Sequence, residues 1–217
     1  MELLFPKQVR EVTQALLTEI GEEYQRSLET FRQVLPEYYY HSTVVGRVCC
    51  DVALQLHLPS DEVGDVTLAG YFHDIGKLKI PIAVVNKDDT LSSKEIREMC
   101  KHVRESVILA PPIPRVRAII GSHHEWQIGG YPRSNPKWTV LPEEERHEPP
   151  ETRKLSQILV ACDQVHAIIS PRTYKGECTD LTQIADRIGI PFYSELQPYL
   201  ELVFDRLVKK AINCLPA

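Results

Sequence analysis

Apolar residues recur at the spacing of an α-helix along most of this chain, and this periodicity constrains its fold more than any other feature. Val44, Val45, Val48, Val52 and Leu56 are an example, because residues three or four apart lie on one face of a helix. Convincing alternation of apolar and polar residues, which is typical of strands, is hard to find. The sequence therefore predicts an all-α protein, a bundle of about seven to eight helices.

Local signals indicate where these helices begin and end. Ser92 and Glu95 form a capping box, and Ser60 is expected to be an N-cap because two acids follow it. Pro111 and Pro114 are expected to end one helix and begin the next. We expect helices at 7–33, 37–57, 61–75, 92–109, 113–124, 152–169, 179–188 and 192–213.

One stretch lacks helical periodicity. Residues 129–151 are rich in proline and charge, so they predict a long surface loop.

With 217 residues, 43% of them hydrophobic, the chain has the length of one ordinary domain with a real core. We expect an N-terminal helical arm at 1–36, which could form a homodimer, and a main domain at 37–217.

Composition excludes several classes of function. A net charge of -5 and a pI near 5.9 argue against binding to polymeric nucleic acid or to an anionic membrane surface. No apolar run approaches the roughly 20 residues of a membrane span, and the opening residues do not resemble a secretory signal. The six cysteines have no C-x-x-C spacing, so we expect reduced, buried thiols and a cytoplasmic location.

Histidines and carboxylates form the pattern that carries chemistry. Each histidine alone is more often an ordinary helix residue than a ligand, but the joint pattern favours a metal cluster. Gly76, after the His-Asp pair, is expected to break a helix so that its neighbours converge on one pocket. The candidate ligands are His41, His73, Asp74, His102, His123, His124 and Asp163.

The ligand types indicate both the metals and the reaction. Imidazoles and carboxylates without cysteine suit Fe, Mn or Zn, and Asp74 has two oxygens that can bridge two ions. Glu37 lies four residues before His41 and is equally consistent with a ligand or a solvated acid. Such a cluster makes water nucleophilic at neutral pH and neutralises phosphoryl charge, so it predicts phosphate ester hydrolysis. Lys77 would place its positive charge beside a non-bridging oxygen of the phosphate.

These residues resemble a known family, the HD-GYP domain proteins, a subgroup of the HD phosphohydrolases. The similarity extends from about residue 37 to residue 174. It includes His41, the run HDIGK at 73–77, His102, the run HHE at 123–125, the run GYP at 130–132 and Asp163.

The resemblance implies hydrolysis of cyclic di-GMP, a bacterial second messenger, at two or three iron or manganese ions. It implies that the candidate ligands above bind metal, with Glu37 as the extra carboxylate of trinuclear members. It also implies that Asp74 and Lys77 are catalytic. Substrate would be contacted by Lys77, Tyr131, Arg172 and Lys175.

The chain departs from the family pattern at two places near the site. The segment between Glu125 and the GYP run is one residue shorter and lacks an aspartate, and His166 stands where a second aspartate is usual. Because His166 is three residues after Asp163, we expect it to border the pocket and contact substrate. Two alternatives therefore stay open, a general nucleotide phosphohydrolase and a catalytically weak, metal-holding signalling module.

Overall fold

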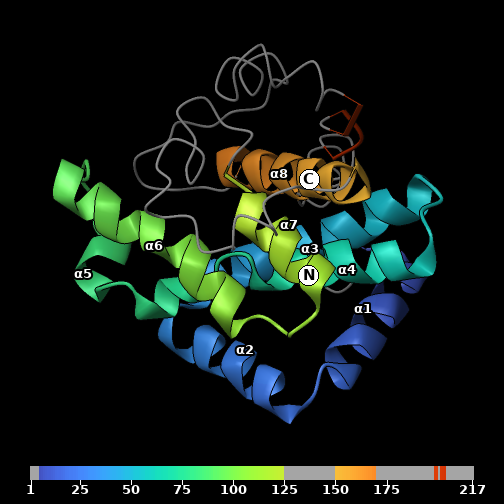
Figure 1. The fold of residues 1–217 in the computed structure, drawn as a ribbon, viewed down its shortest axis with the longest axis horizontal. Helices are drawn as coiled ribbons and strands as arrows, with labels where there is room; N and C mark the ends of the chain where they lie inside the picture. Colours follow the sequence, from blue (N-terminus) through green and yellow to red (C-terminus); the bar gives the residue numbers. More distant parts are fainter. Residues whose placement is uncertain (1–4, 125–149, 170–197, 200, 204–217) are drawn as a thin grey trace, which may run out of the picture.

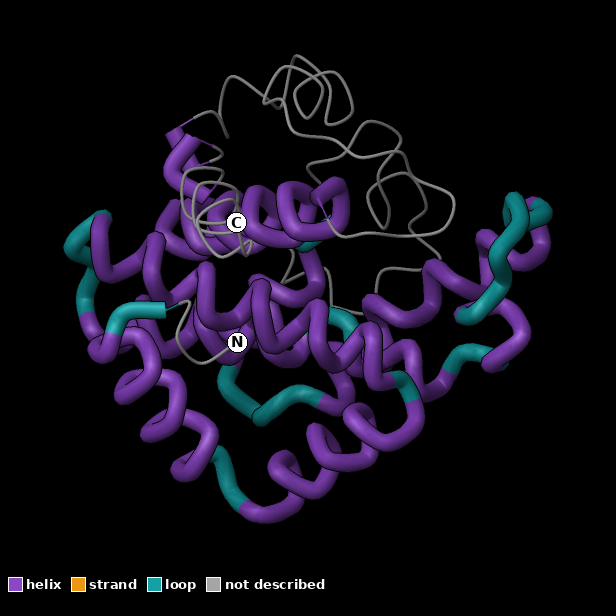
Figure 2. The backbone as a smooth tube through the Cα atoms, turned by 180° about the vertical axis from the view of Figure 1, so that it is seen from behind, coloured by secondary structure: helices purple, strands orange, loops and turns teal. Residues whose placement is uncertain are grey.

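A computed structural model describes residues 5–124, 150–169, 198–199 and 201–203. Within these ranges the regular structure is entirely helical, with no strand (Figure 2). This confirms the all-α fold expected from the periodicity. The helices are α1 (Lys7–Glu19), α2 (Glu22–Val34), α3 (Pro36–Gln55), α4 (Ser60–Phe72), the 3-10 helix η2 (Ile75–Lys79), α5 (Ile82–Val85), α6 (Ser93–Leu109), α7 (Pro114–Ser122) and α8 (Pro150–Ile169).

Helices α3 and α4 pack together in the centre of the molecule. Two glycines let them approach closely, because a Cβ on Gly70 would lie 2.6 Å from the Cα of Gly46. Helix α8 crosses this central pair on one side, and α1 and α2 form a V on the other (Figures 1 and 2). The core is therefore a layered helical packing in which α3 contacts helices on both sides.

The helix predicted at 7–33 is in fact two helices, α1 and α2. The chain turns at Gly21, whose φ of 91° is a conformation that residues with a side chain rarely adopt. Val9 and Phe31, one from each helix, are buried in the same core as α3 and α4. The proposed boundary at residue 36 stays a prediction.

Helix α3 ends in a Schellman motif. The N–H of Leu58 donates to the carbonyl oxygen of Ala53, and the N–H of His57 donates to that of Leu54. His57 takes the left-handed conformation, with a φ of 54°. Glycine is the usual residue at this position, so the chain accepts some backbone strain here.

The capping predictions had different outcomes. Ser92 caps α6 with both hydrogen bonds of the capping box, as predicted. Ser60 is not an N-cap; it is the first residue of α4, Pro59 precedes it, and its side chain makes no capping bond. Helix α4 also ends at Phe72 and not at residue 75, because the chain tightens into η2.

The prolines act where expected, since α6 ends at Leu109 and Pro114 begins α7. Helix α8 begins at Pro150, so the predicted loop 129–151 ends two residues early; proline suits a first helical turn because that N–H needs no intrahelical partner. The rest of this loop, the predicted helix 179–188 and most of 192–213 lie outside the described residues.

The described cysteines, Cys49, Cys50, Cys100 and Cys162, are reduced and buried, as expected. Among the described helices, none combines the length and apolar character that crossing a membrane requires.

Candidate metal centre

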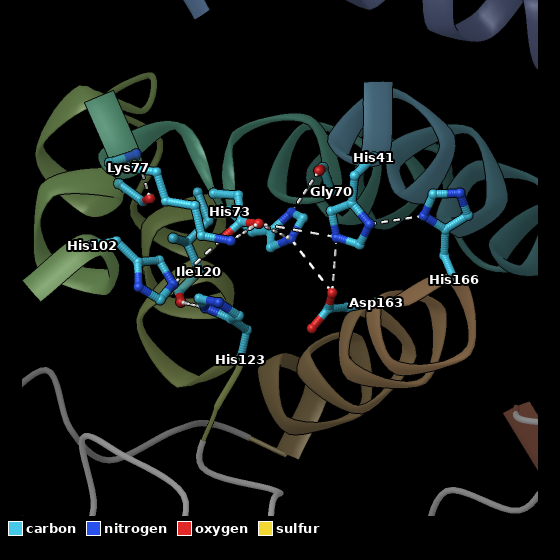
Figure 3. A network of polar contacts seen from close by, with 12 residues as sticks. His41, Gly70, His73, Lys77, His102, Ile120, His123, Asp163 and His166 are labelled. Carbon is cyan, nitrogen blue, oxygen red and sulfur yellow. Dashed lines mark hydrogen bonds and ion pairs between the residues drawn. The ribbon is translucent and has the colours of Figure 1, made fainter. Parts of the chain in front are cut away.

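Side chains from five helices meet beside the α3–α4 pair (Figure 3). His41 lies in α3, and His73 and Asp74 occupy the junction between α4 and η2. His102 comes from α6, His123 and His124 follow α7, and Asp163 comes from α8. All of these side chains except His124 are buried, and His124 is partly buried. The structure thus brings together the seven residues that the sequence singled out first.

One half of the cluster surrounds the ring nitrogens of His41 and His73. The Nε2 of His41 lies 3.0 Å from Oδ1 of Asp163 and 4.0 Å from Oδ2 of Asp74. The Nε2 of His73 lies 3.7 Å and 3.6 Å from the same two oxygens. His41, His73 and Asp74 can each offer one ligand atom to a single ion, and Asp163 faces the same space.

The other half consists of His102, His123 and His124, which form a second group able to hold an ion. The Nε2 atoms of His102 and His124 are 3.3 Å apart. Oδ1 of Asp74 lies 3.4 Å from Nε2 of His102, whereas its Oδ2 faces the first half. Asp74 therefore stands between the two groups with one oxygen toward each, as a bridging carboxylate would.

Backbone carbonyls orient three of these histidines. Nδ1 of His73, His102 and His123 lies 2.9, 2.7 and 2.6 Å, respectively, from the carbonyl oxygen three residues earlier. As donors, these Nδ1–H groups leave Nε2 as the nitrogen with a free lone pair. Nε2 of both His73 and His123 is buried and has no hydrogen-bond partner among the described residues. Buried imidazole nitrogens without partners are what a metal site requires, so the residues fit divalent ions.

The electrostatics favour neutral imidazoles beside ionised carboxylates. Burial raises the pKa of Asp74, but Lys77 and the surrounding histidines outweigh it and hold that pKa well below its usual value. Burial also raises the pKa of Asp163, but His41 and His73 outweigh it and hold that pKa well below its usual value. Burial lowers the pKa of His102 to about 3 and that of His123 well below its usual value. These are the protonation states in which both residue types bind metal.

The pKa values of His41 and His73 are shifted in opposite directions. Burial lowers the pKa of His41, although Asp163 partly opposes it. Burial also disfavours charge on His73, but Asp74 and Asp163 outweigh it and raise that pKa. A metal ion at Nε2 of His73 would therefore compete with a proton.

Gly76 serves the site in a way that the sequence did not indicate. We expected it to break a helix, but α4 has already ended at Phe72 and Gly76 lies within η2. A Cβ at Gly76 would overlap the carbonyl oxygen of His102 and the backbone nitrogen of Ser106. The N–H of Gly76 also donates to Oγ of Ser106 at 2.8 Å. Gly76 thus lets η2, which begins next to Asp74, lie directly against α6.

Lys77 lies beside the bridging carboxylate. Its Nζ donates to Oδ2 of Asp74 at 2.6 Å and stands 4.3 Å from the ring centre of Tyr38. The hydroxyl of Tyr38 donates to the carbonyl oxygen of Val85 in α5. Tyr38 was not predicted, and only its proximity in the fold reveals it.

The remaining predicted site residues fall into three groups. Glu37 is exposed in the first turn of α3 and belongs to neither metal group. His166 is buried, and its Nδ1 lies 2.8 Å from Nδ1 of His41; it shares a helix face with Asp163, as predicted. Tyr131, Arg172 and Lys175 lie outside the described residues.

A sequence model of the HD domain matches residues 19–147, more than half of the chain. The chain belongs to the HD domain family. This confirms the HD phosphohydrolase resemblance, and the family's name matches the His73-Asp74 pair at the centre of the cluster. The GYP segment lies outside the described residues.

Curated relatives of this HD protein are phosphodiesterases. It is 31% identical over 142 residues to the cyclic di-GMP phosphodiesterase PA4108 of Pseudomonas aeruginosa, an alignment that covers 63% of this chain and 31% of that protein. It is 29% identical over 179 residues to the cyclic di-GMP phosphodiesterase response regulator RpfG of Xanthomonas campestris, covering 76% and 44%. The chain thus spans less than half the length of these relatives.

A solved structure supports the same fold. The HD domain of the phosphodiesterase PgpH of L. monocytogenes, in complex with cyclic-di-AMP, superposes with a TM-score of 0.56. The match covers 88% of this chain and 99% of that domain at 16% identity. At this identity the likeness concerns the fold, and it agrees with an all-helical HD domain.

Proposed function

We propose that this protein is a metal-dependent phosphodiesterase that hydrolyses a cyclic dinucleotide, cyclic di-GMP being the expected substrate. The observation that carries the proposal is the position of Asp74, with one carboxylate oxygen facing each of two three-residue metal groups. A single structural ion needs no bridging carboxylate and no second group. The relatives' activities support the class of substrate.

Two divalent ions are proposed, with iron or manganese favoured over zinc and with Glu37 as a ligand to a third ion in a trinuclear form. The histidine and carboxylate donors suit all three metals. Bound divalent ions would supply Lewis acidity, which makes water nucleophilic at neutral pH and neutralises charge on a phosphoryl group. The chain's own residues hold the ions, exclude other ligands by burial and present Lys77 to the phosphate.

The role proposed for Lys77 follows from its charge and position. Its ammonium group is paired with Asp74 and is mostly buried, with a side chain 13% exposed. Held there, it would donate to a non-bridging phosphate oxygen of a substrate lying on the metal pair. Tyr131, Arg172 and Lys175, which lie outside the described residues, remain proposed substrate contacts on the strength of the family resemblance.

Metal content tests the proposal directly. Protein purified from manganese-replete or iron-replete anaerobic culture should contain at least two ions per chain by mass spectrometry. Asp74→Asn should lose more than one, because a bridging carboxylate holds both. Asp51→Asn is the matched control: Asp51 is also buried, but it lies ten residues beyond His41 on α3, roughly 15 Å along the helix axis, and should keep both ions. Wild-type protein without metal would refute the proposal.

Activity is tested with cyclic di-GMP, cyclic di-AMP, pGpG and a generic phosphodiester. Lys77→Met should keep both ions and the fold but lower kcat by about 100-fold, the usual order for loss of one charge-stabilising donor. Lys79→Met is the control, because Lys79 is exposed on the same 3-10 helix. If no cyclic dinucleotide is hydrolysed while the generic ester is, a general phosphohydrolase is the better description. Metal retention without any turnover would indicate a signalling module.

A further inference from the structure

The Nδ1 atom of His41 has a different kind of partner from that of three other histidines in the cluster. His73, His102 and His123 each place Nδ1 against a carbonyl oxygen of their own helix or turn. His41 does not; its Nδ1 lies 2.8 Å from Nδ1 of His166, a side chain 125 residues later in the sequence. A residue on α8 therefore does for His41 what the local backbone does for these three histidines.

His41 is held between two side chains of α8 (Figure 3). Its Nε2 faces Oδ1 of Asp163 at 3.0 Å, and its Nδ1 faces His166 on the opposite side of the ring. His41 and His166 are 4% and 6% exposed, so water has little access to compete for this hydrogen bond. His166 thus lies on the side of His41 away from the metal-facing nitrogen.

The hydrogen bond between the two Nδ1 atoms has only one arrangement compatible with metal binding. A hydrogen bond between two nitrogens carries one hydrogen, so one Nδ1 donates and the other accepts. Nε2 of a metal-binding His41 must keep its lone pair, and the hydrogen of the neutral ring is then on Nδ1. His166 must therefore accept at Nδ1 and carry its own hydrogen on Nε2.

We propose that His166 is a positioning residue that accepts the Nδ1–H of His41 and so fixes the tautomer and ring orientation in which Nε2 of His41 binds metal. This role replaces the substrate contact expected from the sequence. It rests on the proposed metal site but not on the identity of the substrate. His166 acts through His41 and touches neither the ion nor the phosphate.

Two substitutions separate the hydrogen bond from the space that His166 fills. Asparagine carries an oxygen on Cγ, at the position that Nδ1 occupies in histidine, so His166→Asn can still accept from His41. Leucine has the same branch point at Cγ but no acceptor. His166→Leu should therefore lose the hydrogen bond and His166→Asn should preserve it, with similar loss of ring volume.

The readout is Mn2+ affinity, measured on the full chain by competition with a chelator. His166→Leu should weaken one of the two Mn2+ sites by about 10- to 100-fold, the usual effect of removing a partner of a metal-binding histidine. His166→Asn should stay within about threefold of the wild type if the acceptor is what matters. With both sites saturated by Mn2+, KM for a generic phosphodiester should be unchanged in both variants.

Several outcomes would overturn the proposal. If His166→Leu binds Mn2+ as tightly as the wild type, or if the asparagine variant is impaired as much as the leucine variant, the acceptor has no such role. A raised KM in both variants at saturating Mn2+ would indicate that His166 contacts substrate, as the sequence predicted. A wild-type protein that binds no Mn2+ would refute the metal site itself, which is a different failure.

A second measurement needs no variant and so does not depend on how the variants fold. Nitrogen-15 NMR of the imidazoles in the Zn2+-loaded protein distinguishes nitrogens with and without hydrogen. We expect His166 with its hydrogen on Nε2 and His41 with its hydrogen on Nδ1. A hydrogen on Nδ1 of His166 would contradict the proposal.

Discussion

Gly76→Ala should destabilise the protein although it adds a single methyl group. The new Cβ would overlap the backbone of α6 at His102 and Ser106. Backbone cannot rotate away as the end of a flexible side chain can, so η2 and α6 must move apart. The hydrogen bond from the N–H of Gly76 to Oγ of Ser106 would be stretched by the same movement.

The magnitude follows from three contributions. Inserting a methyl group into a packed region costs typically 1–3 kcal/mol, and contact with two backbone atoms places this site at about 3 kcal/mol. Loss of the hydrogen bond costs about 1 kcal/mol more. Alanine recovers up to about 1 kcal/mol over glycine in a helix. The net expectation is a loss of about 3 kcal/mol in the free energy of unfolding.

Urea unfolding of the metal-free full chain measures this value without a contribution from ligand binding. Gly64→Ala is the control, because a Cβ there would lie 3.4 Å from Cδ2 of Leu16, an ordinary contact, within α4. It should be neutral or stabilising by up to about 1 kcal/mol. If Gly76→Ala is as stable as Gly64→Ala, the close packing of η2 on α6 does not constrain the fold as argued.

Two further predictions concern stability away from the cluster. Lys87 and the capping box lower the pKa of Glu95 from its ordinary 4.5 to about 2, so its contribution to stability is present above pH 4.5 and is lost as the pH falls toward 2. Glu95→Gln should be less stable than the wild type at pH 7 in thermal melts, with a difference that narrows below pH 4.5; a constant difference would contradict this. His57→Gly should stabilise by about 1 kcal/mol in urea unfolding, because glycine removes the left-handed strain, and a destabilised variant would show that the His57 side chain matters more.

Much of the fold and the candidate site could be predicted because each relies on local pattern. Helical periodicity placed α3, α6, α7 and α8 within a few residues, and the capping box fixed the start of α6. The adjacent pairs His73-Asp74 and His123-His124 both follow helix ends, where neighbouring side chains can converge.

Contacts between distant segments could not be predicted in the same way. The approach of Gly76 to α6 and the pairing of His166 with His41 join residues that are 30 and 125 positions apart. The turn at Gly21 depends on its positive φ. Because the helical periodicity continues on both sides of Gly21, the sequence predicted one helix there. Short elements such as α5 and η2 contain too few residues to show a period.

Gly70 has two roles that give the centre a mechanical property. Its missing side chain lets α3 approach α4 closely, and its carbonyl oxygen accepts the Nδ1–H of His73 at the end of α4. The ring of His73 therefore moves with α4, whereas His41 moves with α3. A stress that separates the two helices would draw His41 away from His73 and Asp74, so pressure or heat should release an ion bound by this half of the centre before the helices themselves melt.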